Sequence, residues 1–228
     1  MPEGVPGVVV LGDVIDSRRA AAASTAFLRG LIAEMEACYP DALRLASPGI
    51  AQGDELQALL TIDADPFAIV LRAGVRADAR RMRWVVAAGE VDPGHGPATE
   101  RTGPAFLFAR ALMERAKPSR DRLLVETGDP DVDPLLADLA PLLPRLLADL
   151  TARQREVARA IVLDGLRRAE VAARLGISRA TVSVMADRAR VRELAGLARA
   201  LATLFRAGAS RDGAVPSGSD AVTPGSDA

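Results

Sequence analysis

The fold of the C-terminal half is decided by the stretch Glu170-Val-Ala-Ala-Arg-Leu-Gly176-Ile-Ser178 and the ten residues after it. Gly176 lies between two short segments with helical spacing, and glycine readily takes the left-handed backbone conformation of a tight turn. Ser178 suits a helix start, because its hydroxyl can accept from the first free N–H groups. Apolar residues fall where two steeply crossing helices would touch, at Val171, Leu175, Ile177, Val182 and Met185. The stretch therefore predicts two helices joined by a tight turn.

A third helix is predicted just before this pair. Thr151-Ala-Arg-Gln154 fits a capping box, and the helical pattern then continues to about Leu163. Three helices with this turn are typical of a helix-turn-helix, whose last helix enters the major groove of double-stranded DNA. We expect Arg179 to read a guanine by two hydrogen bonds. The other residues expected at base edges are Ser178, Ala180 and Ser183, and those expected at phosphates are Thr181, Arg188, Arg190, Arg153, Arg167 and Arg168.

Charge is distributed unevenly along the 228 residues. Residues 1–150 carry 16 Lys and Arg against 22 Asp and Glu, whereas residues 151–206 carry 12 Arg against 5 acidic residues. A basic segment joined to an acidic one is expected where only that segment meets a polyanion. The charge thus favours DNA binding, and the alternative is a three-helix module that serves assembly.

The N-terminal half alternates strand and helix patterns. Strands are predicted at 8–11, 43–45, 55–61, 82–91 and 123–126, and helices at 20–39, 66–80 and 104–115, with a loop at 47–54. This order predicts an α+β sandwich in which the helices pack on one face of a mostly antiparallel sheet. The C-terminal part is predicted to be all-α.

The same patterns divide the chain into four parts. Residues 1–127 form the α+β domain and 151–206 the helix-turn-helix domain. Between them, 128–150 are a helical connector in which Pro141 and Pro144 are expected to separate two short helices. Residues 207–228 are rich in Gly, Ser, Ala, Asp and Pro, which predicts a disordered tail.

Two acidic motifs stand at strand ends in the N-terminal half. Asp13 directly follows a buried strand, and Gly53-Asp54 begins another. If the two strands are neighbours, the carboxylates lie side by side and suit Mg²⁺, which prefers oxygen ligands and keeps water or phosphates in its shell. Arg18 or Arg110 could then hold a phosphate. The alternative is that the acidic residues cap turns or face solvent.

Four separated motifs together resemble the SatD family of bacterial proteins. They are Val9 to Arg18, Gly53 to Leu60, Trp84 to Glu90 and Gly103 to Arg110, and the resemblance extends over about Val8 to Leu197. It implies a C-terminal helix-turn-helix but no defined activity.

More distantly, the same motifs are similar to the palm-type domain of class III nucleotide cyclases and diguanylate cyclases. That likeness implies a ferredoxin-like or palm-type sandwich in which Asp13 and Asp54 hold metal, with Gly53 and Arg110 at a nucleoside triphosphate. Phe106 departs from the cyclase pattern, which has an asparagine four residues before the helix arginine. The lysine that cyclases place before Gly53-Asp54 is also absent, and Thr102 replaces the aspartate usual in SatD proteins.

We expect a DNA-binding transcriptional regulator that acts as a homodimer and whose palm-like domain senses a metal-bound nucleotide. The alternatives are a Mg²⁺-dependent nucleotidyl cyclase or nucleotidyltransferase with an accessory DNA-binding domain, and an adaptor without ligands. Cys38 is the only cysteine and no apolar run is long enough to span a membrane, so the expected compartment is the cytoplasm.

Overall fold

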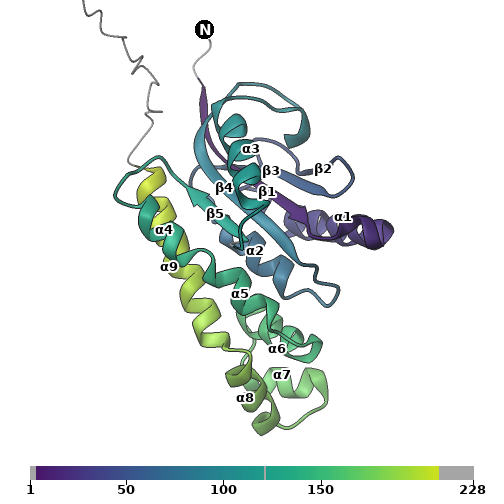
Figure 1. The fold of residues 1–228 in the computed structure, drawn as a ribbon. Coiled ribbons are helices and arrows are strands. Elements are labelled where there is room, and N and C mark those ends of the chain that lie inside the picture. Colours follow the sequence, from purple (N-terminus) through teal and green to yellow (C-terminus); the bar gives the residue numbers. More distant parts are fainter. Residues whose placement is uncertain (1–3, 121, 211–228) are drawn as a thin grey trace, which may run out of the picture.

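A twisted sheet forms one half of the molecule and a group of short helices the other half (Figure 1). The structure is a computed structural model and describes residues 4–120 and 122–210. The strands are β1 (Val5–Val14), β2 (Gly49–Ala51), β3 (Glu55–Thr61), β4 (Met82–Val91) and β5 (Leu123–Glu126). Their order across the sheet is β2-β3-β1-β4-β5. Only the β4–β5 pair is parallel, so the prediction of a mostly antiparallel sheet is confirmed.

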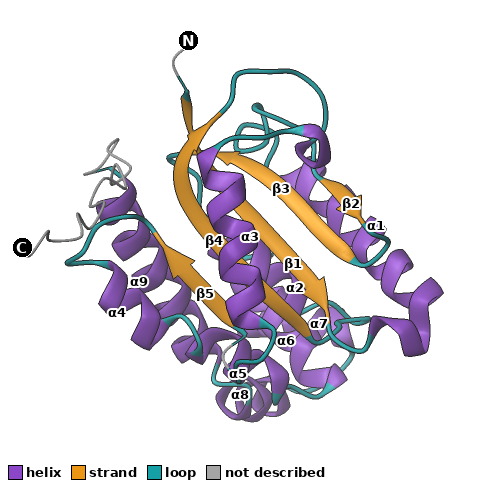
Figure 2. Cartoon of the chain, turned by 45° about the horizontal axis from the view of Figure 1, so that its top comes forward, coloured by secondary structure: helices purple, strands orange, loops and turns teal. Residues whose placement is uncertain are grey.

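Helices cover both faces of this sheet. Val8 and Val10 of β1 face the core formed with α1 (Ala21–Cys38) and α2 (Phe67–Gly74). Val9 and Leu11 face the opposite way, onto α3 (Pro104–Ala116), which crosses the strands in Figure 2. The expectation of helices on one face is therefore wrong. The reason lies in β1, whose four successive residues Val8 to Leu11 are all fully buried and need apolar cover on both sides.

Six further helices follow the sheet. They are α4 (Asp133–Leu139), α5 (Leu142–Ala148), α6 (Ala152–Val162), α7 (Arg168–Leu175), α8 (Arg179–Arg188) and α9 (Val191–Ala209). α4 and α5 are the two short helices expected in the connector; Pro141 lies between them, whereas Pro144 lies in the first turn of α5 and does not break the chain there. Two 3-10 turns, η1 (Ser17–Ala20) and η2 (Ala98–Glu100), complete the described elements.

The long helix α9 returns from α8 to the sheet half, alongside α5 and α4 (Figure 1). Near its end, Phe205 packs edge-on against Phe67 of α2, with ring centroids 6.0 Å apart. One continuous hydrophobic core joins Val8 in the sheet to Val182 in α8. The two halves of the molecule thus share their interior.

Several local predictions differ from the structure. The strand predicted at 8–11 extends over Val5–Val14, so Asp13 lies within it rather than after it. Residues 43–45 form a turn, because Leu43 donates its N–H to the Tyr39 carbonyl and the chain coils; the short β2 lies in the predicted loop instead. α2 stops at Gly74, where a Cβ atom would lie 2.6 Å from the Leu147 side chain. Residues 207–209 form the last turn of α9 rather than the start of a tail, and 211–228 lie outside the described residues.

No helix within 4–120 and 122–210 is both long and apolar enough to cross a membrane.

Phe205→Ala should lower the free energy of unfolding by about 3 to 5 kcal/mol, because it removes a fully buried ring from the core shared by the two halves. Urea unfolding followed by circular dichroism and by Trp84 fluorescence should give one coincident transition. Thr203→Ala, an exposed change two residues earlier, is the matched control and should shift stability by less than about 0.5 kcal/mol. Two separate transitions in the wild type would contradict the shared core.

Candidate functional site

Asp13 lies near the end of β1, and Asp54 lies in the hairpin turn directly before the neighbouring strand β3. β1 and β3 pair antiparallel with Asp13 opposite Glu55, and the Val14 N–H donates to the Asp54 carbonyl at 3.2 Å. The hairpin between β2 and β3 turns at Gly53, whose φ of +85° favours glycine. The structure thus brings together the two acidic residues and the glycine that the sequence singled out.

Each carboxylate already has a partner. Arg83 of β4 donates to Asp13 at 2.9 Å, and the Ser17 hydroxyl donates to Asp54 at 2.5 Å. Burial raises the pKa of Asp13 above its ordinary value, the Arg83 guanidinium opposes that shift, and the Asp54 charge adds to it. Lys117, just after α3, also lowers the pKa of Asp13. The pair is therefore a half-buried acidic site in which Arg83 neutralises Asp13 and the charge of Lys117 acts from the end of α3.

The two arginines expected to hold a phosphate, Arg18 and Arg110, form no ion pair with Asp13 or Asp54 among the described residues. Arg18 is exposed in η1, Arg110 is exposed on α3, and the charges that act most strongly on Asp13 are those of Arg83, Asp54 and Lys117. Phe106, which stands where cyclases have an asparagine, lies on the buried face of α3 and is part of the hydrophobic core. Among the described residues, no group of three or more His, Cys, Asp or Glu is arranged to hold a metal ion.

The three C-terminal helices form as the sequence predicts. The Gln154 N–H donates to the Thr151 hydroxyl at 3.3 Å, and Gln154 accepts from the Thr151 N–H at 2.8 Å, which confirms the capping box that begins α6. Gly176 ends α7 in the left-handed conformation, with φ +63°. Ser178 then caps α8, accepting from the Thr181 N–H at 3.0 Å. These local interactions fix the direction in which α8 leaves the turn.

One face of α8 points to solvent. Its exposed residues are Arg179, Ala180, Val184, Asp187 and Arg188, and Val184 keeps half of its surface in water. Neither Arg179 nor Arg188 forms an ion pair with a residue that the structure describes. An exposed helix face with unpaired guanidinium groups at both ends can bind a polyanion.

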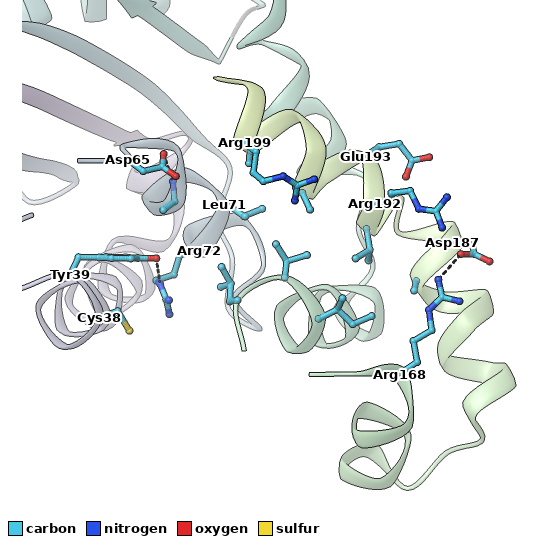
Figure 3. Close-up of a pocket in the computed structure, with 18 residues that line it drawn as sticks. Cys38, Tyr39, Asp65, Leu71, Arg72, Arg168, Asp187, Arg192, Glu193 and Arg199 are labelled. Atoms are coloured by element: carbon cyan, nitrogen blue, oxygen red, sulfur yellow. Dashed lines mark hydrogen bonds and ion pairs between the residues drawn. The ribbon is translucent and has the colours of Figure 1, made fainter. Parts of the chain in front are cut away.

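Other predicted DNA contacts are engaged within the motif. Arg168 of α7 donates to the Ser183 hydroxyl at 3.2 Å and to Asp187 at 3.3 Å, which braces α7 against α8 (Figure 3). Arg167 pairs with Glu170 at 3.0 Å but stays largely exposed. Surface ion pairs of this kind are weak, so Arg167 is free to exchange its partner for a phosphate. Thr181 is half-buried and hydrogen-bonded to Ser178.

Residues 142–192 match the family model of sigma-70, region 4. That region is a helix-turn-helix that binds DNA, and the match runs from α5 to the start of α9. A solved bacterial light-regulated adenylyl cyclase is 12% identical, with a TM-score of 0.38; the alignment covers 55% of this chain and 44% of that chain. No curated protein matches the chain.

Several residues of these sites escaped the sequence analysis. Arg83 pairs with Asp13 from β4, and the charge of Lys117 acts on it from the end of α3; both lie far along the chain, so no local pattern revealed them. Val184 could have been found, since it lies four residues after Ala180 and so shares its helix face.

The pKa of Asp13 should respond oppositely to two substitutions. Asp54→Asn should lower it, because a neighbouring negative charge is removed, and Arg83→Met should raise it, because burial is then less opposed. NMR titration of the side-chain carboxyl carbon measures both, with Arg83→Lys as the charge-conserving control. An unchanged pKa in Asp54→Asn would show that the two carboxylates do not interact.

Proposed function

We propose that the chain is a transcriptional regulator that binds double-stranded DNA through its helix-turn-helix. The observation that carries this proposal is the exposed face of α8, whose arginines lack acidic partners among the described residues, within a segment that matches sigma-70 region 4. The excess of arginine over acidic residues in 151–206 supports the same function.

In the proposed complex, the start of α8 lies in the major groove. Arg179 is long enough and exposed enough to donate two hydrogen bonds to one guanine, and Ala180 and Val184 offer apolar contacts to thymine methyl groups. Arg188, Thr181 and the exposed Arg167 contact phosphates and set the register of the protein on the duplex. A homodimer would place two such helices on a two-fold operator.

We further propose that the sheet half is of the SatD type and has a palm-like, ferredoxin-like arrangement. The order β2-β3-β1-β4, with α1 and α2 on one face, is that of a split β-α-β unit and supports this assignment. The motifs that carry the resemblance lie at the end of β1, in the β2–β3 hairpin, on β4 and at the start of α3.

In this proposal the sheet half senses a nucleotide bound with Mg²⁺. Asp13 and Asp54 would hold the metal, while Arg83, which pairs with Asp13, could exchange that carboxylate for a phosphate, and the charge of Lys117 adds to the positive potential there. Binding would alter the placement of α8 only if the ligand prefers one arrangement of the two halves. The core that they share supplies a physical connection between them.

Arg179→Ala should weaken binding to a specific duplex by about 1 to 3 kcal/mol, because it removes the contacts to one base pair. Arg29→Ala on α1 makes the same change of charge at an exposed position outside the helix-turn-helix and should leave affinity nearly unchanged. Fluorescence anisotropy with duplexes selected from a random pool, at fixed moderate salt, measures both. Equal affinities of Arg179→Ala and wild type would refute the proposed reading helix.

A second candidate is a Mg²⁺-dependent nucleotidyl cyclase or nucleotidyltransferase. The observation that favours it is the coupled pair Asp13 and Asp54 with Arg83 and Lys117 nearby. The donor set is only partly suited to a metal, since Arg83 holds Asp13 and two carboxylates are all that the described residues bring together here. Phe106, in place of an asparagine, gives the site no group to stabilise a transition state.

Calorimetric titration of the whole chain with Mg²⁺ and ATP or GTP separates these candidates. Binding should be lost in Asp13→Asn/Asp54→Asn, because both metal-holding charges are removed, and retained in the exposed control Asp41→Asn. Binding without turnover supports the sensor, whereas product formation that the double variant abolishes would favour the enzyme. If the wild-type chain binds no nucleotide, both the nucleotide sensor and the nucleotide-dependent enzyme are refuted.

A further inference from the structure

Two groups of arginines lie where the sheet half meets the C-terminal helices, and only one of them is neutralised. In the first, Glu34 of α1 pairs with Arg72 and Arg76, at and just beyond the end of α2, and with Arg159 of α6. One carboxylate thus joins α1 to both neighbours. The second group has no ion-paired carboxylate among the residues that the structure describes.

The second group lines a cleft of about 80 Å³ between the α2–β4 turn, the start of β5, and α5 and α6. Arg80, Arg81 and Arg122 come from the sheet half, and Arg155, one helical turn before Arg159, comes from α6. The rest of the lining is apolar or small and includes Trp84, Leu147 and Pro144. Among the residues that the structure describes, no acidic one lines the cleft.

These guanidinium groups have no ion-pair partner among residues 4–120 and 122–210, although the charge of Asp78 acts on Arg80. The Nε atom of Arg155 is buried without a hydrogen-bond partner among those residues. Burial, and then the charges of Arg81 and Arg83, lower the pKa of Arg122. A buried donor without a partner is costly, and native structures satisfy such groups with water or a bound ion.

We propose that this cleft binds a phosphate group held between Arg122 of the sheet half and Arg155 of α6. Guanidinium groups suit phosphate because they present parallel N–H donors and keep their charge. The cleft has room for a group of this size, where several water molecules would otherwise stand. The phosphate supplies at this junction the negative charge that Glu34 supplies at the other.

The larger groove nearby has a different character. It measures about 1060 Å³, and its lining holds four arginines, Arg72, Arg168, Arg192 and Arg199, together with Asp65, Asp187 and Glu193 (Figure 3). Arg72 is paired with Glu34 and Arg168 with Asp187, and the three acidic side chains of the lining would repel an anion. Because the larger groove contains acidic side chains, the smaller cleft suits a phosphate better.

Thermal unfolding of the whole chain in sodium phosphate and in sodium chloride of equal ionic strength tests the site. Phosphate at about ten times its dissociation constant should raise the Tm of the wild type by about 3 to 6 °C. Arg122→Gln and Arg155→Gln should each lose at least half of that gain. In chloride both variants should be at least as stable as wild type, because repulsion among the arginines is relieved.

A matched control is Arg29→Gln, an exposed change on α1 that should keep the full gain. If the arginines merely packed the junction, both cleft variants would lose stability in either salt and keep the phosphate gain, and the proposal would fall. The absence of a phosphate-specific gain in the wild type would overturn binding of free phosphate.

The phosphate could be a free anion or part of a DNA backbone, and salt-dependent binding to duplex DNA distinguishes the two. For a backbone phosphate, Arg122→Gln and Arg155→Gln should each reduce the slope of log K against log salt by about one. An unchanged slope with a lost phosphate gain assigns the site to a free anion, independently of DNA recognition. Neither effect in either variant would refute the phosphate site.

Discussion

The packing of Phe205 on Phe67 is the contact on which the arrangement of the molecule depends. α9 begins directly after α8, and its far end is buried between the elements of the sheet half. Gly208 approaches Thr127 so closely that a Cβ atom would lie 2.4 Å from the hydroxyl oxygen. The packing of Phe205 on Phe67 and the close approach of Gly208 to Thr127 together fix the position of α9 along its axis. Because α8 directly precedes α9, they also fix the position of α8.

Electrostatics reinforces this joint. Glu34, with about a quarter of its side chain exposed, receives guanidinium groups from both α6 and the α2 region. Removing one partner of such a cluster leaves unbalanced charge near the core, which is more costly than losing a surface pair. The shared interior and this ion cluster together make the helix-turn-helix an integral part of the fold rather than an appended module.

Elements whose ends are set by neighbouring residues could be predicted from the sequence. Gly176, Ser178 and Thr151 each act within four residues of the chain, so the C-terminal helices and their turn could be predicted closely. The strand Met82–Val91 was predicted to the residue, because a long alternating run limited by turns has one reading.

Long-range partners were harder to predict. The run Val8 to Leu11 carries no alternation, and this absence is itself the sign of a strand covered on both faces. Arg83 donates to Asp13 across 70 positions of chain, and Arg155 lines the same cleft as Arg122 only because α6 packs near the sheet half. Side chains that converge through topology leave no trace in local spacing, so the carboxylate pair was anticipated while the cations around it were not.

The length of α9 has a mechanical meaning. Its 19 residues extend over about 28 Å, with one end clamped in the sheet half and the other attached to α8. A rigid helix transmits a tilt along its length: a tilt of about 5° about one end displaces the other end by roughly 2 Å. Because Val191 and Leu194 at the start of α9 are buried in the same core as Phe205, repacking around Phe205 shifts the helix-turn-helix together with α9.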